Sequence, residues 1–88
     1  MISQEDKKKI LELAKKYNIS KILLFGSATY KDDYHDIDIA VKGLKPEWFF
    51  KFYGEIILKL SKPIDLIDLD DNNSFVNLIN KEGIKIYG

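Results

Sequence analysis

The stretch that decides the fold is Asp36-Ile37-Asp38-Ile39-Ala40-Val41, which opens with a strict alternation of acidic and apolar residues. Successive side chains of a β-strand point to opposite faces of the sheet, so this alternation predicts a half-buried strand. Ile37, Ile39 and Val41 are expected on the covered face. Asp36 and Asp38 then lie together on the open face, which makes this stretch a candidate site as well as a strand.

Patterns on both sides of this strand predict a small chain of alternating helices and strands. Ser3 is suited to cap a first helix and Asn18 to end it. Pro46 suits the first turn of a later helix, and Pro63 stops that helix. The expected order is helix 3–18, strand 21–25, strand 36–41, helix 46–60, strand 64–69, helix 74–83 and strand 84–87.

The lengths of the connections predict how the strands pair. A helix joins the strands at 36–41 and 64–69, so these strands should be parallel with a right-handed crossover. The connection from Phe25 to Asp36 is too short for a helix, so the first two strands should be antiparallel. The end of the first strand and the starts of the other two then share one edge of the sheet, with Asp65 level with Asp36. This edge gathers Gly26, Ser27, Asp36, Asp38 and Asp65.

The composition indicates one small globular domain, residues 1–88. Lys plus Arg total 14 and Asp plus Glu also total 14, so the formal net charge is zero. A nucleic-acid-binding domain usually carries a basic excess, so this balance argues against bulk binding to DNA or RNA. The sequence has no cysteine, which excludes disulfides and thiolate metal sites and fits a reducing cytoplasm.

No apolar run is long enough to cross a membrane, so a membrane location is not expected.

The charge balance also bears on association. A near-neutral surface gives little repulsion between molecules, which favours a homo-oligomer or a complex with another protein.

The two carboxylates on one strand face point to a metal site. Bare carboxylates this close repel each other, and a divalent cation relieves the repulsion. Mg²⁺ typically takes one or two carboxylates together with water and substrate phosphates. A metal so placed bridges phosphates and neutralises the charge that develops in phosphoryl transfer. The sequence therefore predicts phosphate chemistry at Asp36 and Asp38.

A third carboxylate would bind a second metal ion and accept the proton of the attacking group. Asp65 is the expected residue, because it begins the neighbouring parallel strand. Asp68 is the alternative, although strand periodicity puts it on the opposite face.

Gly26-Ser27 is the expected phosphate-binding segment. Glycine lets the backbone approach a phosphate without a Cβ in the way. Backbone N–H groups after it, at the start of a turn, can donate to phosphate oxygens, and the Ser27 hydroxyl adds another donor.

Several other residues have two open interpretations. His35 either contacts a phosphate or is a solvent-exposed loop residue. Tyr30 and Tyr34 flank the proposed phosphate loop and either stack on a base or pack the loop down. The aromatic stripe from Trp48 to Leu60 has helical spacing, which favours a core position over a base-stacking one.

The segments Phe25-Gly26-Ser27 and Asp36–Val41 together resemble the signature of the DNA polymerase β-like nucleotidyltransferase superfamily. The size of the chain, the strand at 63–69 and the tail at 82–87 resemble its smallest branch, the MNT proteins. The resemblance implies an α/β (α+β) fold, with a mixed sheet and helices packed on one face, as in the polymerase β palm. It implies Gly26 and Ser27 at the triphosphate of ATP, Asp36 and Asp38 as Mg²⁺ ligands, and Asp65 as third carboxylate, metal ligand and base.

The resemblance also implies a partner. Many MNT proteins act as antitoxins beside a HEPN-domain ribonuclease toxin, which they inactivate by transferring AMP to a tyrosine. Many relatives carry a basic residue soon after Gly-Ser, and here Lys31 is the candidate for that role. One alternative stays open, in which the chain is a weak or inactive nucleotide-binding module that neutralises a partner protein by contact alone.

Overall fold

A four-stranded mixed sheet forms the centre of the computed structural model, which describes residues 1–88. The strands lie in the order β3-β2-β1-β4, so the C-terminal strand is an edge strand next to β1. The four predicted strands are all present. They are β1 (Lys21–Phe25), β2 (Ile37–Lys42), β3 (Ile64–Asp68) and β4 (Ile84–Tyr87).

The pairing of the strands follows the connection lengths, as predicted. β1 and β2 are antiparallel, and the register sets Phe25 opposite Asp38. β2 and β3 are parallel, and here the register sets Asp65 opposite Asp38. Asp65 is therefore level with Asp38 and not with Asp36, because β2 and β3 start together at Ile37 and Ile64. Asp38 lies between residues of both neighbouring strands.

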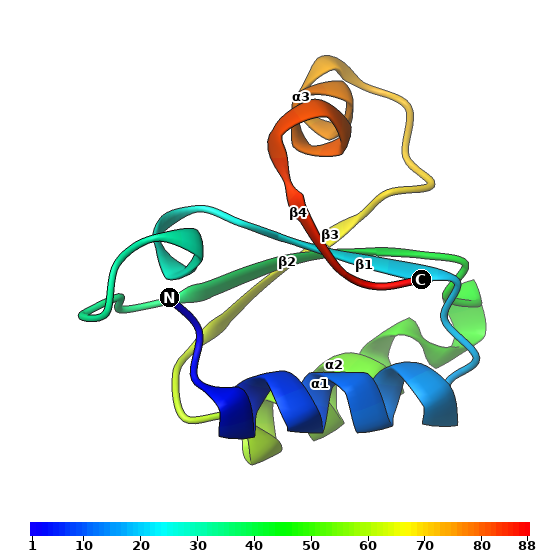
Figure 1. The fold of residues 1–88 in the computed structure, drawn as a ribbon. Coiled ribbons are helices and arrows are strands. Elements are labelled where there is room, and N and C mark those ends of the chain that lie inside the picture. Colours follow the sequence, from blue (N-terminus) through cyan, green and yellow to red (C-terminus); the bar gives the residue numbers. More distant parts are fainter.

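Two helices cover one face of the sheet (Figure 1). They are α1 (Gln4–Lys16) and α2 (Phe49–Lys59), the latter preceded by the single turn η2 (Pro46–Trp48). The predicted cap is present, since the Asp6 N–H donates to Ser3 Oγ at 3.1 Å, and Asn18 follows the helix with a left-handed φ of 55°. Between this layer and the sheet lies a core of 18 buried residues, among them Ile37, Ile39 and Val41.

The third helix, α3 (Ser74–Glu82), lies on the other face of the sheet (Figure 1). The expectation of helices on one face is therefore corrected for α3. The physical reason is a second apolar cluster on that face, made of Leu23, Ala40, Leu69, Val76 and Ile79. Asn73 caps this helix, because its Oδ1 accepts the Val76 N–H at 2.9 Å.

The helices are short. The longest, α1, has 13 residues, and none of the three has the length and apolarity that a membrane crossing requires.

Gly54 offers a test of helix packing within α2. It is exposed, and a Cβ built there meets no atom within 4 Å, so the residue does not mark a close contact. Gly54→Ala should raise the free energy of unfolding by about 0.5–1 kcal/mol, because alanine is the better helix former. Urea unfolding of the purified protein measures this change.

Gly83→Ala is the matched control. A Cβ at Gly83 would lie 2.7 Å from the Ile79 carbonyl oxygen, so this substitution should lower stability. A Gly54→Ala protein that is no more stable than the wild type would contradict the argument.

Candidate active site

Three acidic residues lie near one another at one edge of the sheet, on the face that also carries α3. Asp38 and Ala40 share a strand face, and Ala40 belongs to the cluster beneath α3. Asp65 pairs with Asp38 in the parallel register, and Asp36 directly precedes β2. Asp36 and Asp65 are exposed, whereas Asp38 between them is half-buried. The edge predicted from the sequence is thus present, with Asp38 at its centre.

The electrostatics of this edge are unfavourable without a counter-ion. Burial raises the pKa of the Asp38 carboxyl above its ordinary value, and the neighbouring charges of Asp65 and Asp36 raise it further. A raised pKa means that the folded protein resists the negative charge at this position. The donor set therefore fits a hard divalent cation such as Mg²⁺, which prefers oxygen ligands and would stabilise the ionised form.

The carboxylates do not enclose a cation by themselves. No group of three or more His, Cys, Asp or Glu side chains is gathered closely enough to form a coordination shell. Mg²⁺ usually keeps several water ligands and is bound through one or two carboxylates plus substrate phosphates. The arrangement fits a metal that binds together with a triphosphate better than a permanently held structural ion.

Gly26 directly follows β1 and lies beside Asp38. Its backbone has φ 73° and ψ −160°, a region that is essentially restricted to glycine. A Cβ at this position would lie 2.0 Å from Asp38 Oδ2. Both the backbone conformation and the available space therefore require glycine here, and no side chain fits between the backbone and the carboxylate.

A single turn, η1 (Ser27–Thr29), follows Gly26. Its first hydrogen bond runs from the Thr29 N–H to the Gly26 carbonyl at 3.2 Å, so the turn itself does not use the N–H groups of Ser27 and Ala28. The Thr29 hydroxyl also donates to the Gly26 carbonyl at 2.7 Å, which fixes the turn. Backbone N–H groups at the start of such a turn are suited to bind phosphate oxygens.

Asp68 lies apart from this group. Its Oδ1 accepts the Asp70 N–H at 2.9 Å and so stabilises the turn after β3. Strand alternation sets it on the opposite face from Asp65. The geometry thus brings Asp65, and not Asp68, next to Asp38.

The two tyrosines near the turn have different environments. Tyr34 is buried, and its hydroxyl accepts the Ser3 N–H at 3.1 Å, so it packs the loop against the N-terminus. Tyr30 is 70% exposed. Lys31 Nζ lies 5.9 Å from the centroid of the Tyr30 ring, and His35 is exposed. Of these two tyrosines, only Tyr30 is available to contact a ligand through its ring.

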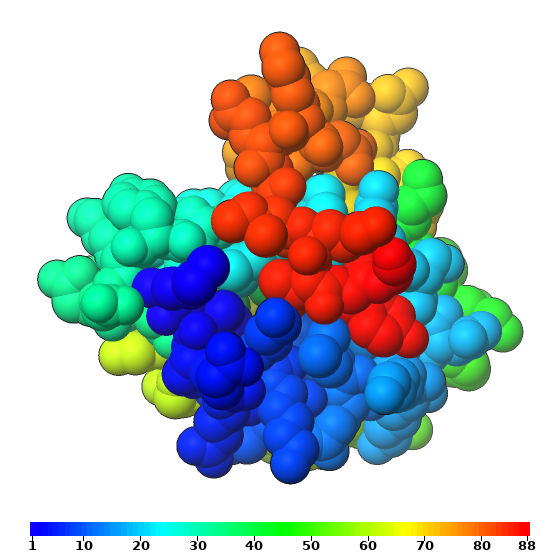
Figure 2. Space-filling view, viewed as in Figure 1, coloured from blue at the N-terminus to red at the C-terminus, as the bar shows by residue number.

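A groove of about 330 Å³ opens beside Gly26 and Ser27, between η1 and α3. Figure 2 shows the surface hollowed between the α3 lobe and the segment that carries η1. The sequence alone gives no sign of this groove, because the groove depends on which face of the sheet α3 packs against. Only the unexpected position of α3 reveals it. The lining residues are Phe25, Gly26, Ser27, Thr29, Tyr30, Phe75, Leu78, Ile79, Glu82 and Gly83.

The fold and this edge define a nucleotidyl-transfer protein, in which a glycine turn and strand carboxylates meet at one point. The chain belongs to the polymerase β nucleotidyltransferase family, since the family described as "Polymerase beta, Nucleotidyltransferase" matches residues 8–88. A comparison with curated proteins gives no significant match.

Within that family the chain is similar to MNT antitoxins of known structure. A complex of tri-AMPylated Shewanella oneidensis HEPN toxin with MNT antitoxin matches at 26% identity and a TM-score of 0.75, covering 99% of this chain and 73% of the other. A toxin–antitoxin structure with AMP-PNP matches at 25% identity and a TM-score of 0.72, covering 93% and 73%. An MntA–HepT complex at 24% identity and a TM-score of 0.74, covering 98% and 73%, shares the fold.

The carboxylate repulsion leads to a prediction about stability. Because the pKa of Asp38 is raised on folding, ionising it as the pH rises from acid to neutral destabilises the folded state. Asp38→Asn should therefore raise the free energy of unfolding at pH 7 without metal. This advantage should disappear below the ordinary pKa of aspartate, where Asp38 is protonated in both states. Urea unfolding at pH 7 and pH 3 measures the effect.

Asp71→Asn is the matched control, because Asp71 is exposed in the turn after β3. It should leave stability nearly unchanged at both pH values. If Asp38→Asn were less stable than the wild type at pH 7, the repulsion argument would be wrong.

The close approach at Gly26 leads to a second prediction. Gly26→Ala should destabilise the protein by about 1–3 kcal/mol, because alanine is strained at this φ and ψ. It should also displace the Asp38 carboxylate, since the new methyl group would occupy its place. Thermal unfolding and a crystal structure of the variant test both effects. Wild-type stability with Asp38 undisplaced would refute this account of the turn.

Proposed function

We propose that the chain transfers AMP from ATP to a tyrosine of a HEPN-domain toxin and thereby acts as its antitoxin. The observation that carries the proposal is the position of Asp38, which lies between Asp65 and the Gly26 turn and close to Asp36. This arrangement provides ligands for a metal and donors for phosphates at one point. The tri-AMPylated toxin in the complex with MNT antitoxin, and the AMP-PNP structure, support the same reaction here.

Each residue has a distinct role in this proposal. Asp36, Asp38 and Asp65 would hold one or two Mg²⁺ ions together with the phosphates of the substrate, and the metal would supply charge neutralisation there. The backbone N–H groups of Ser27 and Ala28 donate to phosphate oxygens, and the Ser27 hydroxyl adds a further donor. We assign Lys31 to the basic position that relatives have near Gly-Ser.

The transfer is a displacement at the α-phosphorus of ATP. The tyrosine oxygen of the acceptor forms a bond to this phosphorus as the bond to the bridging oxygen breaks, and pyrophosphate leaves. Asp65 accepts the phenolic proton. It suits this role because it is exposed and lies on the outer side of Asp38, toward the edge strand β3, where an acceptor can approach.

The openness of the site supports a protein acceptor. Asp36 and Asp65 are exposed, so the edge that they form is open to solvent. A side chain presented by another folded protein can therefore reach the carboxylates, and that protein would complete the walls of the site. We propose that residues 1–88 act as one catalytic unit in the cytoplasm, where ATP and Mg²⁺ are available.

Transfer of label from [α-³²P]ATP to the purified toxin tests the proposal. Asp38→Asn should reduce labelling by more than about 100-fold, because loss of a metal ligand exceeds the usual cost of disturbing an outer-shell residue. Asp71→Asn is the control, since this residue has the same chemistry outside the site, and its rate should stay at the wild-type level.

A tyrosine-to-phenylalanine variant of the labelled toxin residue should accept no label. If the wild-type chain neutralised the toxin in cells without labelling it, and Asp38→Asn did so equally well, the enzymatic proposal would fail in favour of inhibition by contact.

A further inference from the structure

The groove between η1 and α3 has an unusual concentration of exposed apolar side chains. Tyr30 is 70% exposed, Phe75 is 51% exposed and Leu78 is 49% exposed. The protein has eight large hydrophobic residues with this degree of exposure, and these three all line the same groove. Apolar surface gathered in one concave place marks a site for a ligand or a partner.

The aromatic rings of the groove are held in place by the fold. Phe25 and Phe75 make an edge-to-face contact with ring centroids 6.1 Å apart, which joins the end of β1 to α3. Phe25 is half-buried and is fixed by its strand, while the outer side of Phe75 is open. Such a pair presents a prepared apolar surface against which a flat aromatic group can pack.

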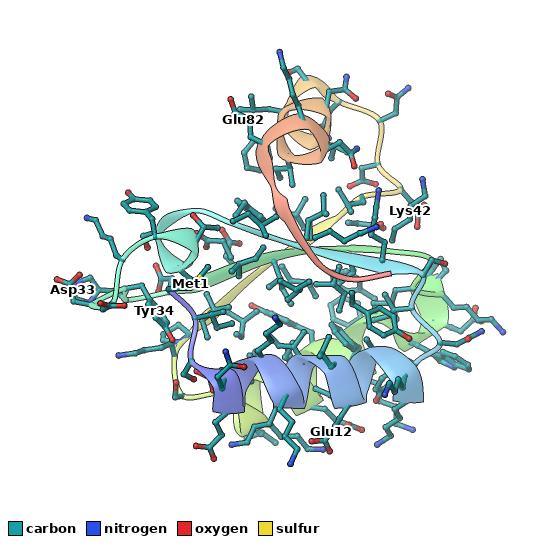
Figure 3. All side chains as sticks on the ribbon, in the orientation of Figure 1. Met1, Glu12, Asp33, Tyr34, Lys42 and Glu82 are labelled. Carbon is teal, nitrogen blue, oxygen red and sulfur yellow. The ribbon has the colours of Figure 1, made fainter.

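The two ends of the groove have opposite preferences for charge. One end is formed by Gly26 and Ser27, beside the backbone donors of η1. The other end carries Glu82, which projects from α3 (Figure 3). A phosphate would be repelled by the Glu82 carboxylate and attracted by the donors of η1. A ligand with one anionic end and one flat apolar end therefore fits in a single orientation.

The groove and Asp65 lie on opposite sides of Asp38. In the sheet order β3-β2-β1-β4, Asp65 lies on β3 and the groove begins at the end of β1, so Asp38 on β2 separates them. An acceptor that approaches Asp65 and a group that fills the groove would not collide. The volume of about 330 Å³ is at the lower end for small-molecule sites and is sufficient for one heterocyclic base.

We propose that this groove binds the base of the nucleoside triphosphate, with the base packed on Phe75 and Leu78 and covered by Tyr30. This assignment rests on the proposed function, because it needs the phosphates at Gly26 and Ser27. The base is then bound through apolar and stacking contacts, and Glu82 accepts a hydrogen bond from a base that presents an amino group.

The experiment compares two ligands that share the phosphates and differ in the base. Isothermal titration in Mg²⁺ measures the affinity of the chain for ATP and for inorganic tripolyphosphate. Phe75→Ala should weaken ATP binding by about 5- to 100-fold, the usual loss for one stacked base, and should leave tripolyphosphate binding unchanged. Leu78→Ala is a second variant with the same expected selectivity, and circular dichroism checks that both variants fold.

Phe50→Ala is the matched control, because Phe50 is a phenylalanine on α2 that is 83% exposed and lies outside the groove. It should bind both ligands with wild-type affinity. Ser27→Ala should weaken both ligands together, since it removes a phosphate donor.

The possible failures are distinguishable. If folded Phe75→Ala and Leu78→Ala bound ATP as the wild type does, the groove assignment would be overturned and the proposed function would stand. If the variants lost AMP transfer but kept wild-type affinity for ATP, the groove would hold a side chain of the acceptor protein and not the base, and the assignment would be overturned. Equal weakening of ATP and tripolyphosphate would also overturn it. If the wild-type chain, alone and with its toxin, bound no ATP, the nucleotide site itself would be refuted, and the proposed function with it.

Discussion

The close approach of the Gly26 backbone to the Asp38 carboxylate is the constraint on which the site depends. A Cβ at residue 26 would lie 2.0 Å from Asp38 Oδ2, so the turn passes the carboxylate only because residue 26 has no side chain. The antiparallel register that pairs Phe25 with Asp38 creates this approach. It sets the turn that we propose to bind phosphates beside a carboxylate on a rigid strand, which is the kind of preorganisation that phosphoryl transfer needs.

The two faces of the sheet divide stability and chemistry between them. The face under α1 and α2 contributes to a core of 18 buried residues, which supplies most of the hydrophobic stabilisation. On the other face the buried cluster has five residues, two of which lie on α3 itself, and the carboxylates lie at the edge of this face. Repulsion among three acidic residues is tolerated at this edge because the first face holds the sheet together without them. A destabilised site on a well-packed scaffold is a common feature of active centres.

The position of α3 gives the site its shape. By packing on Leu23 and Ala40, this helix forms a wall beside the glycine turn and converts an open sheet edge into a groove. The side toward β3 has no such wall. A protein with one walled side and one open side can hold a small substrate and still admit a residue from another protein, which agrees with a toxin as acceptor.

The sequence by itself determined the strands, their pairing and the edge at which they meet. Alternation around Ile37 and Ile39 predicts one buried face, and connection lengths decide parallel or antiparallel pairing, because both depend on local geometry alone. The gathering of Gly26, Asp38 and Asp65 at one edge followed from that pairing, but the register, which sets Asp65 opposite Asp38 and not Asp36, did not. The sequence could not place α3, since Val76 and Ile79 form an apolar stripe that fits either face of a sheet. Only the tertiary structure showed which face offers a matching apolar patch. Packing between residues distant in the chain therefore decided the groove, the burial of Tyr34 and the exposure of Tyr30.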